Sequence, residues 1–324
     1  MLSNFSYIHP KSLKEAVRQL SADGSRLHAG GTDLLGCLRD HVFEIKRMVS
    51  ISGLKDLQGI NKTSDGGLRI GALAAVADVA ENPQVKENYS ALAQAASSVA
   101  SPQLRNQGTI GGNICQKPRC WYYRGDFRCL RKGGDKCFAV AGENQYHCIL
   151  GGGPCFMVHP SDMASALIAH EATLHIVGPK GSRTMASERF HVPPKVDVRR
   201  ETMLDPAEIV SEIFLPPAKN VRSSYRKVRA RASWDFALAG MALVLRFNND
   251  VVTRARAVLS GAAPIPWRSM EVENAIIGNR LDPDIISRAA TAAMTAARPL
   301  AGNDYKVALF RGIIEEELTM QKKA

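Results

Sequence analysis

The sequence predicts an α+β protein built from more than one domain. Its 324 residues exceed what a single hydrophobic core usually holds. Residues 1–55 alternate helix and strand patterns around a glycine turn, whereas the last third places two long strands before three helical segments. We therefore expect units over residues 1–55, 56–216 and 217–324, with the second boundary at Pro216-Pro217.

Composition describes an ordinary soluble globular chain, with 45% hydrophobic and 23% charged residues. No apolar run approaches the roughly 18 residues that a membrane-spanning helix requires. The N-terminal residues lack the basic and apolar regions of a secretory signal. We expect a cytoplasmic protein, in which thiols stay reduced and clustered cysteines favour a metal site over disulfides.

The first two units contain patterns for both helices and strands. Ser12 and Glu15 form a capping-box pattern at the start of a helix with Leu13, Ala16, Val17 and Leu20 on one face. Residues 26–40 predict a strand, a glycine turn and a helix. Further strands are predicted over 47–51, 67–73, 172–178 and 208–216, and further helices over 86–100 and 162–170.

The third unit begins with a hairpin. Residues 238–261 contain two apolar strands around an Asn249-Asp250 turn. Three helices are then predicted near 267–277, 284–297 and 305–321.

Two glycine loops stand out because each allows a close approach of the backbone to a ligand. "AGGTDLL" (29–35) lies between a strand and a helix, where backbone N–H groups can surround a phosphate, although by itself the motif fits an ordinary tight turn equally well. "GTIGGN" (108–113) is the second loop. Neither matches the G-x-G-x-x-G of a Rossmann fold, so a standard NAD site is not predicted. Two such loops suit a long phosphate-bearing ligand such as a dinucleotide.

Six of the seven cysteines fall between Cys115 and Cys155. Between Gln116 and Lys136 the chain also carries seven Lys or Arg against two acids. This basic segment has three interpretations: a surface for nucleic acid or an acidic partner, a solvated loop, or the surroundings of an anionic group of the protein's own. Zinc competes for the thiols, although the closest pair, Cys115 and Cys120, lies at the upper edge of a C-x₂₋₄-C knuckle.

The motifs "AGGTDLL", "TIGGN", "HPSDMASAL" and "SYRKVRARASWDFALAG", in this order, resemble the FAD-binding subunit of xanthine dehydrogenase-family molybdenum hydroxylases. The resemblance runs nearly end to end. It implies a PCMH-type FAD-binding domain of two α/β subdomains, followed by a C-terminal domain like that of the carbon monoxide dehydrogenase flavoprotein, with an antiparallel sheet and helices.

The resemblance also implies which residues bind FAD. The first loop would hold the pyrophosphate, the second loop would support it, and an aspartate, a strand residue and a lysine would complete the site. Val210 is equally explained as strand core, and Asp162 as the N-cap of a helix. The implied cofactor residues are Leu27, His28, Ala29, Gly30, Gly31, Thr32, Asp33, Leu34, Thr109, Gly111, Gly112, Asn113, Asp162, Val210 and Lys227.

The cysteine-rich segment, about residues 115–156, is an insertion relative to most of this family. It resembles a subgroup, including 4-hydroxybenzoyl-CoA reductase and certain bacterial aldehyde and xanthine dehydrogenases, whose flavoprotein subunit binds an extra [4Fe–4S] cluster. The matching ligands are Cys120, Cys129, Cys137 and Cys155. Cys115 and Cys148 are left over, with Cys148 a plain buried thiol or an alternative ligand, and Cys37 is expected in the core. The basic side chains would offset the cluster's negative charge.

The resemblance predicts an electron-transfer subunit and no complete enzyme. Substrate chemistry would occur at a molybdenum cofactor on a large partner, and a small partner would carry two [2Fe–2S] clusters, giving a heterotrimer. An external partner such as ferredoxin, NAD or a quinone would exchange electrons with it. We name no residue here as a substrate acid, base or nucleophile, and expect no nucleic acid as partner. The alternatives are a free-standing flavin oxidoreductase and a basic, zinc-containing nucleic-acid-binding protein.

Overall fold

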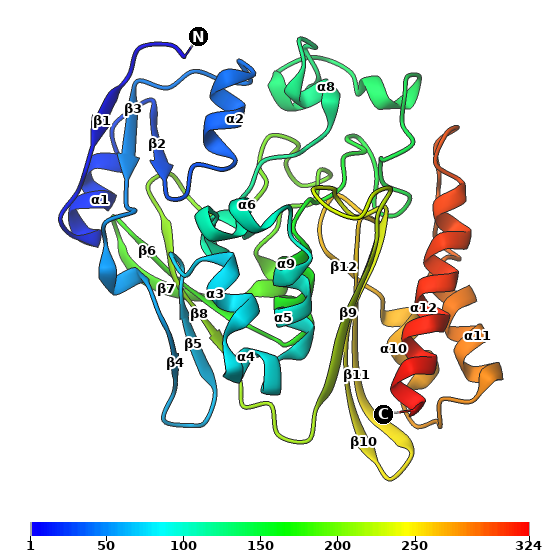
Figure 1. The fold of residues 1–324 in the computed structure, drawn as a ribbon. Helices are drawn as coiled ribbons and strands as arrows, with labels where there is room; N and C mark the ends of the chain where they lie inside the picture. Colours follow the sequence, from blue (N-terminus) through cyan, green and yellow to red (C-terminus); the bar gives the residue numbers. More distant parts are fainter. Residues whose placement is uncertain (1, 324) are drawn as a thin grey trace.

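The computed structural model describes residues 2–323, which form three β-sheets with α-helices between and beside them (Figure 1). The strands are β1 (Ser6–Ile8), β2 (Ser25–His28), β3 (Arg47–Ser50), β4 (Ile60–Lys62), β5 (Leu68–Gly71), β6 (Thr173–Gly178), β7 (Gly181–Ala186), β8 (Ile209–Leu215), β9 (Arg222–Val228), β10 (Ala239–Asn248), β11 (Val251–Ser260) and β12 (Trp267–Arg268). The helices are α1 (Leu13–Leu20), α2 (Leu34–Arg39), α3 (Val76–Glu81), α4 (Pro83–Asn88), α5 (Ser90–Ser97), α6 (Pro102–Gln107), α7 (Ile110–Ile114), α8 (Trp121–Arg124), α9 (Asp162–Ala169), α10 (Met270–Ile276), α11 (Pro283–Ala293) and α12 (Tyr305–Lys323). Short 3₁₀ turns are η1 (Lys55–Leu57), η2 (Leu130–Lys132), η3 (Phe138–Val140) and η4 (Ser187–Arg189).

The N-terminal unit is a small parallel sheet in the order β1-β3-β2, with α1 beside it. The Ser12 hydroxyl accepts a hydrogen bond from the Glu15 backbone N–H at 3.2 Å, so α1 begins where the capping pattern predicts. Ala16 and Val17 are buried in one core cluster with Val49 of β3. The glycine turn connects β2 with α2 and is the first of the two loops predicted to approach a ligand.

The middle unit is an antiparallel sheet in the order β4-β5-β8-β6-β7. In the first four residues of β6, burial alternates along the strand, as expected when one face of a sheet meets a core and the other meets solvent. Helices α3, α5 and α9 share the core of this sheet and lie between it and the C-terminal sheet (Figure 1). This packing holds α9, with Asp162 at its start, in the centre of the molecule.

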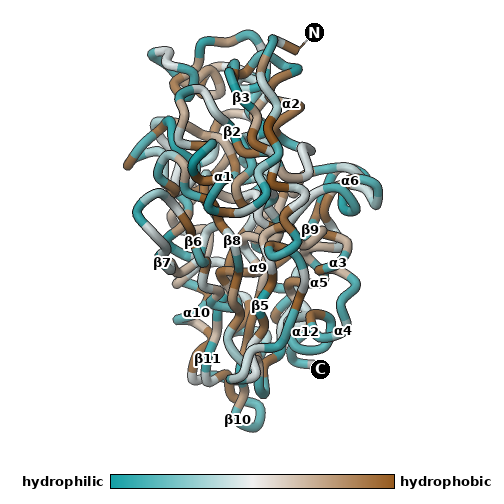
Figure 2. The backbone as a smooth tube through the Cα atoms, turned by 90° about the vertical axis from the view of Figure 1, so that its left-hand side faces the viewer, coloured by the Kyte–Doolittle hydropathy of each residue, from teal (hydrophilic) through white to brown (hydrophobic). Residues whose placement is uncertain are grey.

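The C-terminal unit is the antiparallel sheet β12-β11-β10-β9, with α10, α11 and α12 on its outer side (Figure 1). The continuous apolar run Ala239–Leu245 fits a strand covered on both faces, by α9 on one side and α12 on the other. Asn249 adopts a positive φ of 51° in the predicted hairpin turn. Viewed edge-on, hydrophobic segments fill the interior and hydrophilic residues mark this turn (Figure 2).

Two predicted helices differ from the structure. The helix predicted over 86–100 is broken at Tyr89, where φ is −134° and α4 ends before α5 begins. The Tyr89 hydroxyl donates to the Pro216 carbonyl at 2.8 Å, so a tertiary contact accompanies the break. The helix predicted from Trp267 begins only at Met270, because Trp267 and Arg268 pair with β11 as β12.

The cysteine-rich segment lies at one end of the molecule, between the N-terminal unit and the C-terminal helices (Figure 1). Contacts on both sides hold it there. Arg124 of α8 donates to the Asp33 carboxylate at 2.6 Å, and Lys306 of α12 donates to the His147 carbonyl at 3.1 Å. An insertion predicted from the sequence as one segment is therefore packed against two separate units.

Candidate cofactor sites

The structure brings both predicted glycine loops to one cleft, which we call the glycine-loop cleft. Its walls come from the β2–α2 turn, the start of α7 and strand β8. Of the residues implied to bind FAD, those that line it are Leu27, Ala29, Gly30, Gly31, Thr32, Asp33, Leu34, Thr109, Gly111, Gly112 and Val210. Sequence motifs from three distant parts of the chain thus meet at one surface.

Local backbone geometry explains the shape of both loops. Gly31 has a φ of +72°, a conformation that glycine adopts at little cost, and its carbonyl accepts from the Leu35 N–H at 3.1 Å. In the second loop Thr109 caps α7 by accepting from the Gly112 N–H at 3.2 Å. Thr109 therefore has a structural role in addition to lining the cleft.

Two of the glycines are required by the protein's own packing. A Cβ atom on Gly30 would lie 2.0 Å from the Gln107 carbonyl oxygen, and one on Gly111 would lie 2.9 Å from the Ala72 carbonyl oxygen and from its Cβ. The sequence suggested glycine here for close approach to a ligand. The contacts add a second reason, because the loops pack tightly against neighbouring backbone even without one.

Four of the implied cofactor residues do not line the glycine-loop cleft. His28 Nδ1 lies 3.1 Å from the Ser50 hydroxyl, and the Asn113 side-chain oxygen accepts from the Ser161 hydroxyl at 2.5 Å. Asp162 and Lys227 form a buried ion pair at 2.7 Å, with side-chain exposures of 5% and 4%. The sequence also offered Asp162 as the N-cap of its helix, and this is wrong, since Ser161 is the N-cap and accepts from the Ala164 N–H.

Asp162 is held from the C-terminal sheet. The Tyr225 hydroxyl donates to its Oδ1 at 2.6 Å, while Lys227 donates to its Oδ2. Burial and the neighbouring Asp162 carboxylate raise the pKa of Tyr225 well above its usual range, so this hydroxyl stays protonated and donates. The start of α9 and strand β9 are thereby fixed to each other.

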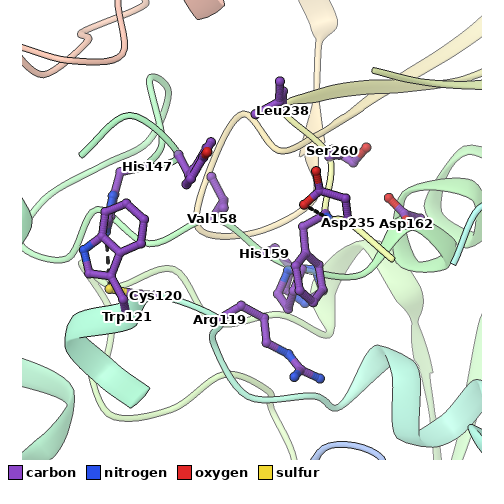
Figure 3. A pocket seen from close by; sticks show the side chains of 14 residues that line it. Arg119, Cys120, Trp121, His147, Val158, His159, Asp162, Asp235, Leu238 and Ser260 are labelled. Carbon is purple, nitrogen blue, oxygen red and sulfur yellow. Dashed lines mark hydrogen bonds between the residues drawn. The ribbon is translucent and has the colours of Figure 1, made fainter. Parts of the chain in front are cut away.

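Asp162 also lines a second pocket, which we call the aromatic pocket (Figure 3). Cys120, Trp121 and His147 lie on one side of it, and Asp162, Asp235 and Ser260 on the other (Figure 3). The remaining lining residues are Arg119, Tyr146, Val158, His159, Pro160, Phe236, Ala237 and Leu238.

Arg119 connects the aromatic pocket with the glycine-loop cleft. Its guanidinium lies 3.0 Å from the Asp33 carboxylate of the cleft and 5.3 Å from the centre of the Phe236 ring of the pocket. His159 is buried, and desolvation lowers its pKa well below the usual range, so its imidazole is neutral. Its Nε2 has no hydrogen-bond partner among the described residues.

The four cysteines proposed as cluster ligands line a third, small cavity, which we call the cysteine cavity. It is closed by Tyr122, Tyr123, Leu130, Arg131, Phe138 and Met157 in addition to Cys120, Cys129, Cys137 and Cys155. Tyr122 and Tyr123 thus lie beside the thiols, whereas Trp121 lines the aromatic pocket. Cys120 lines both.

Electrostatics in the cysteine cavity favour a thiolate at Cys155. The Cys137 thiol beside it and the buried Arg131, which donates from Nε to Cys155 Sγ at 3.4 Å, lower the pKa of Cys155 below its usual range. Arg131 Nη2 is buried with no partner among the described residues.

The other three cysteines do not line this cavity. Cys115 lines the glycine-loop cleft, and Cys37 and Cys148 are fully buried. Burial raises the pKa of Cys148 and of Cys115 to about 12. Among residues 2–323, no three His, Cys, Asp or Glu side chains are arranged to hold a single metal ion.

Four of the seven Lys and Arg side chains of the basic segment pair with two carboxylates, those of Asp33 and Glu201. Arg119 and Arg124 pair with Asp33, and Lys117 pairs with Glu201. Arg131 is the basic side chain of this segment that contacts a thiol in the described structure, and it also pairs with Glu201 at 2.8 Å. Sequence reasoning missed Glu201, because nothing near it in the chain marks it as part of a site.

Comparison with known proteins identifies the family. The family model described as "FAD binding domain in molybdopterin dehydrogenase" matches residues 3–218. The chain belongs to the FAD-binding subunits of molybdenum hydroxylases. The model of the CO dehydrogenase flavoprotein C-terminal domain matches residues 223–320 of this subunit. The predicted fold and the predicted family are thus confirmed.

The relatives are subunits of oxidoreductases, which confirms the prediction that this chain is an oxidoreductase subunit. The aldehyde oxidoreductase FAD-binding subunit PaoB of Escherichia coli is 35% identical over 271 residues, covering 82% of this chain and 83% of the relative. The carbon monoxide dehydrogenase medium chain of Hydrogenophaga pseudoflava is 29% identical and covers 97% of this chain and 96% of the relative.

Solved structures share the fold along the whole chain. The carbon monoxide dehydrogenase of Hydrogenophaga pseudoflava that lacks the Mo-pyranopterin moiety aligns with a TM-score of 0.78 and 26% identity, over 99% of both chains. Quinoline 2-oxidoreductase of Pseudomonas putida aligns with a TM-score of 0.78 at 19% identity, which supports the fold alone. In the described residues, no helix combines the length and apolar character needed to cross a bilayer.

Proposed function

We propose that this subunit holds FAD and a [4Fe–4S] cluster and carries electrons within a molybdenum hydroxylase complex. The observation that carries this proposal is the convergence of Cys120, Cys129, Cys137 and Cys155 on one cavity beside the pocket that contains Asp162. FAD supplies hydride and single-electron chemistry, and an iron–sulfur cluster supplies single-electron transfer. The protein's own residues bind, orient and shield both groups.

The glycine-loop cleft fits a dinucleotide. The glycines of both loops line it together with Thr32 and Thr109, which suits the close approach of a pyrophosphate. Arg119 leads from this cleft to the aromatic pocket, where Trp121 and Phe236 could flank a flat ring. Asp162, held by Tyr225 and Lys227, would orient that ring by its position at the pocket wall.

The cysteine cavity fits an anionic cluster with thiolate ligands. It offers four thiols, and soft sulfur donors suit iron–sulfur clusters. Arg131 points a permanent positive charge at Cys155, and its buried Nη2 has no partner among residues 2–323. A buried guanidinium N–H without an acceptor is costly, and an anionic group in this cavity would supply the acceptor. Cys120 lines both the cysteine cavity and the aromatic pocket, so electrons would have a short way between the two groups.

Partner subunits would complete the enzyme. The relatives are named as FAD-binding subunits and medium chains, which supports a complex of several subunits. As the family resemblance implies, a large partner would carry a molybdenum cofactor and a small partner two [2Fe–2S] clusters. We propose that substrate, an aldehyde, a purine or an aromatic compound, is transformed on the large partner. Ferredoxin, NAD or a quinone would then be the external electron partner, in the cytoplasm.

The test is the cofactor content of the purified chain together with single cysteine replacements. We expect one FAD, about four irons and four sulfides per chain. Cys129→Ser should remove or change the EPR signal of the reduced cluster, whereas the matched controls Cys115→Ser and Cys148→Ser should retain it.

Three outcomes would contradict the assignment. A colourless protein with one zinc would favour the zinc-containing alternative, and a yellow protein without iron would leave a flavoprotein only. If Cys148→Ser removes the cluster while Cys155→Ser keeps it, the fourth ligand is Cys148.

A further inference from the structure

Three charged side chains connect the glycine-loop cleft with the cysteine cavity, and we call them the ionic bridge. Lys117 lines the cleft, Arg131 lines the cavity, and Glu201 lies between them. The Glu201 carboxylate pairs through Oε2 with the Lys117 ammonium and through Oε1 with Arg131 Nη1 at 2.8 Å. One carboxylate therefore serves two cations, and each cation faces a different site.

The bridge is shielded from water at its centre. The side chains of Arg131 and Glu201 are 1% and 8% exposed, whereas that of Lys117 is 33% exposed. Charges shielded in this way interact more strongly than charges at the surface, because less solvent screens them. A change in the charge of one member should thus be felt by the others.

Both ends of the bridge are attached to their sites. The Lys117 backbone N–H donates to Asp33 of the cleft at 2.7 Å, which fixes where its side chain begins. At the other end Arg131 contacts the Cys155 sulfur and leaves Nη2 free among the described residues. Glu201 lies about seventy residues after Arg131 in the chain, and its carboxylate accepts hydrogen bonds from Lys117 and Arg131.

We propose that Glu201 is a positioning residue that couples the charge in the glycine-loop cleft to the reduction potential of the group held in the cysteine cavity. This inference rests on the proposed function. With Lys117 in place, the carboxylate is compensated twice and Arg131 offers most of its positive charge to the cavity. When an anion in the cleft draws the Lys117 ammonium away from Glu201, the carboxylate offsets more of the positive charge of Arg131. The group in the cysteine cavity is then harder to reduce.

The coupling predicts a definite pattern of potentials. Lys117→Met removes one cation, so the cluster potential should fall although the residue lines the other site. Glu201→Gln removes the anion, so the potential should rise. In the Glu201→Gln background, Lys117→Met should change the cluster potential little, because the carboxylate that holds the Lys117 ammonium near Arg131 is gone.

The experiment is a redox titration of the cluster by EPR in the FAD-loaded chain. Lys117→Met should change the ratio of reduced to oxidised cluster at a fixed potential by about fivefold or more, and by less than about twofold in the Glu201→Gln background. Lys132→Met is the matched control, since Lys132 adjoins Arg131 but donates to the Gly125 carbonyl. Its effect should be the same in both backgrounds.

The failures are distinguishable. Absence of iron and sulfide from the wild-type chain would refute the proposed function. A cluster whose potential ignores Lys117→Met, or shifts equally with and without Glu201, would refute the bridge alone. If Glu201→Gln fails to assemble, Lys117→Met by itself still decides, because a potential that does not fall overturns the proposal.

Discussion

At Gly111 the fold itself leaves no room for a side chain larger than hydrogen. An added Cβ would meet the Ala72 carbonyl oxygen and Cβ at 2.9 Å, and Gly111 N donates to that same carbonyl at 2.9 Å. We therefore expect Gly111→Val to lower the melting temperature by several degrees as well as to remove flavin. At Gly112 an added Cβ would meet the Thr109 hydroxyl oxygen at 3.0 Å, so Gly112→Ala is the milder comparison. A Gly111→Val protein of unchanged melting temperature would contradict the packing argument.

His147 is the residue that contacts the cysteine shared by two pockets. Its Nε2 lies 3.3 Å from Cys120 Sγ (Figure 3), and burial lowers its pKa to about 4, so the ring is neutral. A neutral imidazole can still donate one N–H, and hydrogen bonds to ligand sulfur raise a cluster's potential. We expect His147→Phe to lower that potential in an EPR titration, with His147→Gln closer to wild type. Equal potentials in all three proteins would exclude the hydrogen bond as a determinant.

At the scale of elements, long periodic segments are predictable and short or paired ones are not. The capped helix α1, the β10–β11 hairpin and α12 follow from local patterns, since each contains its own signal. The break at Tyr89 accompanies a contact with Pro216, 127 residues later in the chain, and the strand at Trp267 depends on its pairing with Leu259 of β11. Propensity in the window around each residue cannot contain that information.

Helix α12 anchors the cysteine-rich segment through a buried lysine. Lys306 donates to the carbonyls of His147 and Gly261 at 3.1 and 2.6 Å, and burial lowers its pKa to about 8 from 10.5. Between these two values the unfolded chain binds more protons than the folded one, so this residue's contribution to stability rises with pH. Against Lys306→Met, which does not titrate, the wild-type free energy of unfolding should gain roughly 2 kcal/mol from pH 8 to pH 10. If the free energies of unfolding of the two proteins, measured with urea, change with pH in the same way over that range, the shifted pKa is contradicted.

At the scale of the whole molecule, the two kinds of site residue differ in how they could be found. The glycine loops and the cysteines carry their signal in a few consecutive letters, because a ligand needs those residue types at those spacings. Glu201 acts through contacts with Lys117 and Arg131, which are distant in the chain, and Tyr225 acts through a contact between the C-terminal sheet and α9. The sequence therefore predicted most of the residues that line the glycine-loop cleft and the cysteine cavity, but could not indicate what holds them in place.

The whole subunit should depend on partners for substrate turnover. The relatives are named as subunits or medium chains, and we propose for this chain a role in electron transfer alone. The isolated chain should fold and bind FAD, and reduce an artificial dye from a reduced donor, yet oxidise no aldehyde, purine or aromatic compound. Adding the molybdenum subunit and the [2Fe–2S] subunit should restore turnover.

This chain has a net charge of +11, so its assembly with the partners should weaken at moderate salt, because screening acts over about 8–10 Å. The measurement is turnover of each candidate substrate with a dye acceptor, by the chain alone and in the assembled complex. Robust oxidation by the chain alone would identify a self-contained flavoenzyme instead.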